Sequence, residues 1–153
     1  MNVTDTIPKP GPAASPLTRP FWDAAREERL LIQHCRSCTR WVFYPRQRCP
    51  HCWADELEWR EASGRARIVS FTVVQRAGHP AFADDVPYVV ALIDLEEGPR
   101  MLTNIVELTL SELDVGDAVE VAWQHHPSHS LPQFRPVRDI DDHAQRGELE
   151  QHK

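Results

Sequence analysis

Hydrophobic residues follow two different patterns on either side of Ser63-Gly64, which indicates two small subdomains. On the N-terminal side the apolar stretches are short. Thr18 and Pro20 suit the cap and the first turn of a helix, which we expect to run to about Arg29. Three short strands are expected to follow, at residues 30–33, 41–44 and 57–60.

After Ser63-Gly64 the apolar stretches are longer and rich in β-branched residues, which is typical of a larger β-structure. Strands are expected at residues 65–76, 87–95, 101–108, 119–123 and 131–137, with a short helix or turn at 110–115. Pro132 and Pro136 interrupt the last strand, so we expect it to lie at an edge. This pattern predicts a mainly β fold in which a five-stranded OB-fold barrel follows the N-terminal helix and short strands.

The cysteines form one pattern, because Cys35, Cys38, Cys49 and Cys52 make two C-x2-C pairs separated by ten residues. Two such pairs can place four thiolates around one tetrahedral metal ion. We expect a structural zinc in a rubredoxin-like zinc ribbon, with an iron site or two disulfide bonds as the alternatives. A site closed by four sulfurs has no open position for water or substrate, so it indicates architecture and not catalysis.

Charge is distributed unevenly along the chain, whose net charge is −6. Residues 19–67 hold ten arginines against seven acidic residues, whereas acidic residues outnumber basic ones after them. The negative net charge disfavours general nucleic-acid binding. We expect a cytoplasmic protein, because no apolar run approaches the ~18 residues of a membrane span and no signal segment precedes the ribbon.

Five arginines in the second half of the ribbon, or where the chain enters the barrel, are candidates to bind the phosphates of a ligand. The planar fork of arginine suits phosphate because it donates two parallel hydrogen bonds. Arg46 and Arg65 are the first choices, and the others are Arg40, Arg48 and Arg67. The alternative interpretation is a solvated basic face that binds nothing.

Aromatic residues of the expected helix and ribbon form a second candidate surface. Phe21 and Trp22 lie on a short helix, and Trp41 and Phe43 lie in the ribbon. Two interpretations are open for these residues, because large aromatic side chains need a covering surface. They pack in the chain's own core, or they dock on a partner subunit.

Several segments resemble one known family, in the order in which they occur along the chain. They are residues 20–25 (PFWDAA), 44–46 (YPR), 49–52 (CPHC), 70–74 (SFTVV) and 94–100 (DLEEGPR). The chain resembles the zinc-ribbon plus OB-fold family of acyl-CoA-associated proteins found beside thiolase-like enzymes, formerly a domain of unknown function. The resemblance covers about residues 17–138. The chain departs from the family at Glu28, Thr39 and Trp53, where glycine is usual.

This resemblance implies a non-catalytic accessory subunit that helps to bind or channel an acyl-CoA. The implied partner is a thiolase-like protein (a thiolase, an aldolase or a ketosynthase-type enzyme), in a heterotetramer with two copies of each chain. We expect a flexible arm (1–16), the helix and zinc ribbon (17–62), the OB-fold (63–138) and a flexible tail (139–153). The alternative function is a nucleic-acid-binding module, because ribbons and OB-folds both serve that role.

Overall fold

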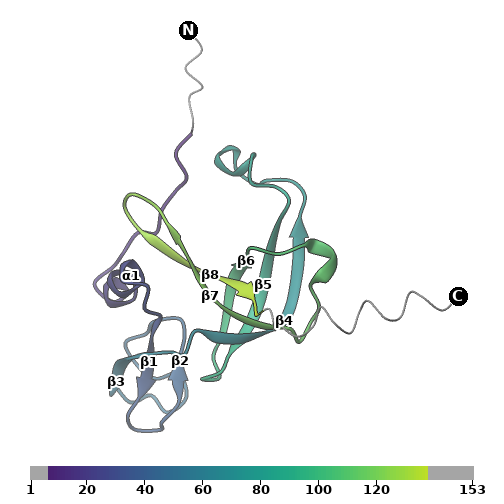
Figure 1. Ribbon diagram of the computed structural model, residues 1–153. Coiled ribbons are helices and arrows are strands. Elements are labelled where there is room, and N and C mark those ends of the chain that lie inside the picture. Colours follow the sequence, from purple (N-terminus) through teal and green to yellow (C-terminus); the bar gives the residue numbers. More distant parts are fainter. Residues whose placement is uncertain (1–6, 138–153) are drawn as a thin grey trace, which may run out of the picture.

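The structure is a computed structural model that describes residues 7–137. It contains one α-helix, a three-stranded sheet and a closed five-stranded barrel (Figure 1). The mainly β class, the N-terminal helix and the OB-fold barrel are thereby confirmed. Residues 1–6 of the expected arm and the expected tail at 139–153 lie outside the described residues.

Helix α1 spans Arg19–Arg26 and ends three residues before the expected end. Its C-terminus is closed by two hydrogen bonds, which the N–H groups of Glu28 and Arg29 donate to the carbonyls of Ala25 (3.2 Å) and Ala24 (3.0 Å). Glu28 has a φ of 58°. This left-handed residue reverses the chain and satisfies carbonyls that the helix leaves unpaired, so the helix cannot continue.

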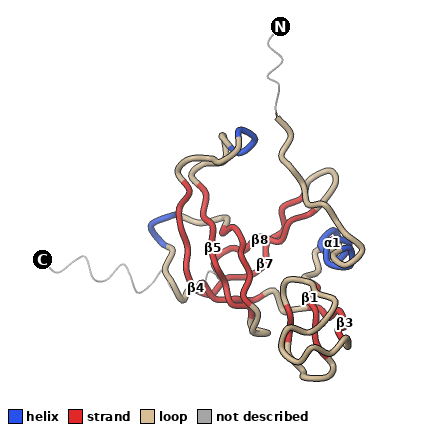
Figure 2. The backbone as a smooth tube through the Cα atoms, turned by 180° about the vertical axis from the view of Figure 1, so that it is seen from behind, coloured by secondary structure: helices blue, strands red, loops and turns tan. Residues whose placement is uncertain are grey.

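The ribbon sheet has β1 (Leu31–Cys35) at its centre, paired antiparallel with β2 (Trp41–Val42) and β3 (Leu57–Glu61). Figure 2 shows this sheet next to α1. The small buried cluster of the ribbon tip consists of Val42 and two of the cysteines, Cys35 and Cys49. Such a cluster buries too little apolar surface to hold the ribbon tip alone, so the tip needs a metal as its staple.

The barrel strands are joined in the closed order β4-β5-β6-β8-β7. They span Arg65–Val74 (β4), Tyr88–Leu95 (β5), Arg100–Ile105 (β6), Ala118–His125 (β7) and Ser130–Pro136 (β8). Two short 3-10 helices interrupt the connections: η1 (Pro80–Phe82) follows β4, and η2 (Leu110–Glu112) lies where the short helix or turn was expected.

The prediction that the last strand is an edge was wrong, because β8 lies between β6 and β7. The carbonyl of Phe134 accepts a hydrogen bond from the N–H of Val106, at 2.8 Å, so the backbone groups of even-numbered β8 residues face β6. Pro132 and Pro136 are both even-numbered. The positions at which the prolines lack an N–H therefore face β6, which is paired with β8 in register only at Ile105 and Phe134. Neither proline removes a hydrogen bond from the extensive ladder between β7 and β8.

One hydrophobic core joins the barrel to the helix and the ribbon. Phe134 and Ile93 are fully buried inside the barrel, and Ile32 of β1 and Phe21 of α1 belong to the same cluster. The helix, ribbon and barrel are therefore held as one unit, which fixes the clefts between them. No helix within residues 7–137 is long and apolar enough to cross a membrane.

Candidate metal centre and ligand cleft

The two cysteine pairs lie in knuckles with the same backbone geometry. In each knuckle the N–H of the first cysteine donates to the carbonyl five residues later: Cys35 to Arg40 at 2.8 Å, and Cys49 to Ala54 at 2.9 Å. The carbonyl of the same cysteine accepts from the N–H four residues later, at 2.8 and 2.9 Å. This repeated turn aims both sulfurs of a pair at one point.

The residue after each knuckle has a left-handed conformation, with a φ of 61° at Thr39 and 63° at Trp53. Glycine is the usual residue for such a φ, because it has no Cβ to clash. In this chain both positions are filled by residues that have a Cβ. The knuckle geometry is kept because backbone hydrogen bonds determine it.

The four sulfur atoms converge on one point, and all lie within 4.8 Å of one another. The Sγ atoms of Cys35 and Cys52 are 3.6 Å apart, as are those of Cys38 and Cys49. A tetrahedral zinc with Zn–S bonds of about 2.3 Å separates its sulfurs by about 3.8 Å, so the four residues fit the ion. Within residues 7–137 this is the only cluster of possible metal ligands.

The thiols of this centre influence one another's ionisation. Burial opposes ionisation of Cys49, but the backbone N–H groups of His51 and Cys52 lower its pKa to about 7. The backbone N–H of Arg40 also lowers the pKa of Cys38, yet burial and the three neighbouring thiols raise it to about 12. Hydrogen bonds among the thiols lower the pKa of Cys49 and raise that of Cys38, so ionisation of one sulfur depends on its neighbours, and a cation among them favours the thiolate forms.

A polar cleft of about 500 Å³ separates the ribbon from the turn between β5 and β6. Arg40, Arg46 and His51 line it from the ribbon, and Arg100 lines it from the barrel. Glu97 is the acidic residue of the lining, and its Oε1 accepts a hydrogen bond from the Ser63 N–H at 2.6 Å. Basic groups from two subdomains therefore meet in one cleft, which suits an anionic ligand.

The arginines of this cleft are positioned by hydrogen bonds, through the backbone for Arg46 and through the guanidinium for Arg40 and Arg100. The buried amide of Gln33 clamps the backbone of Arg46, because Nε2 donates to its carbonyl at 2.9 Å and Oε1 accepts from its N–H at 2.7 Å. The guanidinium of Arg40 lies 3.2 Å from Nδ1 of His51. Arg100 makes two hydrogen bonds to Asp94, at 2.8 and 3.0 Å, which hold the pKa of that carboxyl below its usual value.

The structure brings together some of the five candidate arginines and separates the others. Arg40 and Arg46 line the cleft. Arg48 donates to the carbonyl of Trp53 at 3.2 Å, and the side chain of Arg67 donates to Gly116 at 3.1 Å. Arg65 lies on β4, in backbone register with Glu120 of β7, and does not line the cleft.

Two residues of the cleft were not among the sequence-based candidates. His51 stands inside a cysteine knuckle, and the sequence assigns it no role there because four sulfurs already satisfy the metal. Arg100 is 54 positions beyond Arg46 in the chain. The only local signal for Arg100 is the preceding Glu97-Gly98-Pro99 turn. This turn indicates that the chain reverses direction, but it does not indicate which part of the molecule lies next to it.

An apolar groove of about 280 Å³ lies next to the cleft, between α1, the turn after β2, β6 and β8. Phe21 contributes to its wall but is only 6% exposed, and its ring packs on Trp22 at 4.8 Å and on Phe43 at 5.9 Å. Phe21 thus belongs to the chain's own core. Trp22 and Phe43 are partly buried against the same core and line the groove.

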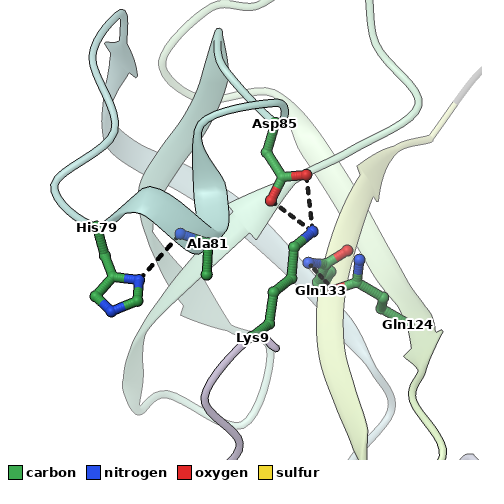
Figure 3. A network of polar contacts seen from close by, with 6 residues as sticks. All are labelled: Lys9, His79, Ala81, Asp85, Gln124 and Gln133. Atoms are coloured by element: carbon green, nitrogen blue, oxygen red, sulfur yellow. Dashed lines mark hydrogen bonds and ion pairs between the residues drawn. The ribbon is translucent and has the colours of Figure 1, made fainter. Parts of the chain in front are cut away.

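The residues before α1 also contact the barrel. Lys9 reaches Asp85 in the loop between β4 and β5, with Nζ 2.7 Å from the carboxylate (Figure 3). In the same loop Nδ1 of His79 accepts from the N–H of Ala81 at 3.1 Å, and so caps η1. His79 therefore has a local structural role. The ion pair is partly exposed, so its contribution to stability is at most about 1 kcal/mol.

Comparisons with known proteins agree with this architecture. The rubredoxin-like zinc ribbon domain of ChsH2 matches residues 22–58, and the C-terminal OB-fold domain of ChsH2 matches residues 59–124. A probable enoyl-CoA hydratase alpha subunit of Thermomonospora curvata is 39% identical over 119 residues, which are 76% of this chain and 37% of that protein. The chain thus spans little more than a third of the length of this relative.

In two further relatives the match covers most of the other protein. A DUF35 domain-containing scaffold protein of Methanothermobacter thermautotrophicus is 36% identical over 96 residues, 62% of this chain and 71% of that protein. The solved structure of the Ltp2-ChsH2(DUF35) aldolase matches with a TM-score of 0.74 and 36% identity, over 82% of this chain and 98% of that chain. The chain therefore belongs to the ChsH2 (DUF35) family, in which a rubredoxin-like zinc ribbon precedes an OB-fold domain.

Proposed function

We propose that the chain is a non-catalytic accessory subunit of a thiolase-like enzyme and that it holds the nucleotide end of an acyl-CoA. The observation that carries this proposal is the cleft in which Arg40, Arg46, His51 and Arg100 converge from ribbon and barrel. Coenzyme A carries a pyrophosphate and a 3′-phosphate, which are the groups that arginine forks bind best.

The charge balance of the cleft supports a phosphate ligand. Arg100 is already paired with Asp94. Arg40 and Arg46 form no ion pair within the described residues, and Arg46 is held only through its backbone. Their guanidinium groups are therefore available to a ligand. The remaining candidates contribute only a weaker, long-range attraction to the phosphates; they are Arg48, Arg65 and Arg67.

The role of a partner follows from the chemistry that this chain lacks. All four thiols are committed to the metal centre, and a closed four-sulfur site offers no position for a substrate. Catalysis is thus assigned to the partner. The names of the relatives, a scaffold protein and a structure titled as an aldolase with two named components, support this assignment. A dimeric thiolase-like partner would bind two copies of the chain by its symmetry.

Calorimetric titration of the zinc-loaded full chain with CoA tests the proposal. Arg46→Ala should weaken binding by about tenfold if its phosphate contact is shielded from water, and Arg40→Ala should act in the same direction. The matched control is Arg76→Ala, because Arg76 is exposed, follows the end of β4 and is not among the residues that line the cleft. Repeating the titration at two salt concentrations measures the electrostatic share.

Wild-type affinity in both cleft variants would show that the basic lobe is only a solvated face, and would overturn the proposal. A labelled oligonucleotide is titrated beside CoA, because the fold also suits nucleic acid. Tight oligonucleotide binding without CoA binding would favour the nucleic-acid module instead. The net charge of −6 argues against that outcome.

A further inference from the structure

The apolar groove and the basic cleft form one continuous surface. Phe43 lines both of them. On β6, Arg100 lines the cleft and the next residue, Met101, lines the groove. A ligand that extends from the basic cleft past Phe43 therefore enters the apolar groove directly.

The walls of the groove expose more apolar surface than the fold needs. Along β6, Met101, Thr103 and Ile105 are buried, so the outward position between them would ordinarily be polar. Leu102 occupies that position and is 53% exposed. Tyr44 also lines the groove and is 55% exposed, and its ring packs on Phe43 at 4.3 Å. These side chains present an apolar wall that is fixed by the core behind it.

Two amide side chains give the groove a few polar positions. Asn104 uses its Nδ2 to donate to the Val89 carbonyl at 3.0 Å. Gln133 uses its Nε2 to donate to Oε1 of Gln124 at 2.9 Å, as Figure 3 shows. Both residues line the groove, and each keeps its amide oxygen as an acceptor for a ligand N–H.

We propose that this groove holds the pantetheine arm of the CoA, an inference that rests on the proposed function. The arm follows the pyrophosphate directly, is largely aliphatic and carries two amide N–H groups. An apolar groove of about 280 Å³ with two amide acceptors matches this chemistry and lies near the lower end of ligand-site volumes, about 300 Å³. The thioester and the acyl group then lie beyond the groove, where a partner can reach them.

The test compares ligands that differ only in the arm. The zinc-loaded full chain is titrated with 3′-phosphoadenosine 5′-diphosphate, which is the nucleotide end alone, with CoA and with octanoyl-CoA. Wild type should bind CoA about tenfold more tightly than the nucleotide, and octanoyl-CoA no more tightly than CoA. We call the ratio of the CoA affinity to the nucleotide affinity the CoA increment. Leu102→Thr and Tyr44→Ser should each lower this increment about fivefold and leave the nucleotide affinity unchanged. Leu110→Thr, an exposed leucine on η2 outside the groove, is the matched control.

The outcomes separate this inference from the function on which it rests. Equal wild-type affinity for CoA and the nucleotide would overturn the groove inference and leave the proposed function intact. An increment that survives in both groove variants would also overturn it and assign the groove to the partner's surface. A gain for octanoyl-CoA that Leu102→Thr abolishes would place the acyl chain there instead, again against the inference. Binding of none of the three ligands would overturn the proposed function itself.

Discussion

The left-handed residues of the zinc knuckles allow a direct test of what stabilises the ribbon. Thr39 and Trp53 have φ angles of 61° and 63°, which cost a residue with a Cβ about 1–2 kcal/mol. Glycine avoids that cost but loses about 0.5–1 kcal/mol more conformational entropy on folding. Replacing each residue with glycine should therefore stabilise the ribbon by about 0.5–1 kcal/mol, and the double variant by about 1–2 kcal/mol.

The structure indicates that little is lost with the two side chains. Trp53 is 74% exposed, so its removal takes away little buried apolar surface. Thr39 is also exposed. Both residues hold the knuckles through their backbone N–H groups, at 2.8 and 2.9 Å from the cysteine carbonyls, and glycine keeps those groups. The control is alanine at both positions, since it removes the side chains but keeps the Cβ and hence the backbone strain.

Zinc affinity is the appropriate measurement, because metal binding and ribbon folding share one free energy. Competition with a chelator should show that the double-glycine variant binds zinc about five- to thirtyfold more tightly than wild type. The double-alanine variant should show no such gain. The reasoning is refuted if the glycine and alanine pairs bind zinc equally well, because the left-handed backbone would then carry no measurable cost.

Three further predictions concern the metal, catalysis and the partner. Metal analysis should find one zinc per wild-type chain, and Cys49→Ser should lose the zinc and unfold the ribbon. A Cys49→Ser variant that keeps the metal would contradict this prediction. The isolated chain should turn over no acyl-CoA, and any partner-free hydrolysis or condensation in a spectrophotometric assay would count against the accessory role. Trp22→Ala should weaken co-purification with the thiolase-like partner, whereas an unchanged complex in a folded variant assigns Trp22 to the chain's own core.

Local chemistry made the ribbon and the strand content predictable. The two C-x2-C pairs specify four converging sulfurs whatever surrounds them, and the structure places those sulfurs within 4.8 Å of one another. The β-branched runs likewise predicted the barrel strands to within a few residues, for example β5 at Tyr88–Leu95. In both cases the determining interactions lie close together in the chain.

Features that depend on pairing between distant segments were not predictable in this way. Pro132 and Pro136 predicted an edge strand because sequence alone does not tell which side of a strand lacks hydrogen bonds. β8 tolerates both prolines inside the barrel, since they face the strand that it meets only briefly. Phe21 showed the same limit: its burial under Phe43 depends on how the helix docks on the ribbon.

Gln33 connects the metal centre to the ligand cleft, and no sequence pattern revealed it. It is 4% exposed in the central ribbon strand, two residues before the zinc ligand Cys35, and its side-chain amide holds the backbone of Arg46. A buried amide is retained when its hydrogen bonds are satisfied, and here both partners belong to one residue of the cleft. We therefore expect removal of the zinc to weaken ligand binding in this cleft: Cys35 ends β1, and Gln33 on the same strand holds the backbone of Arg46, which lines the cleft together with Arg100.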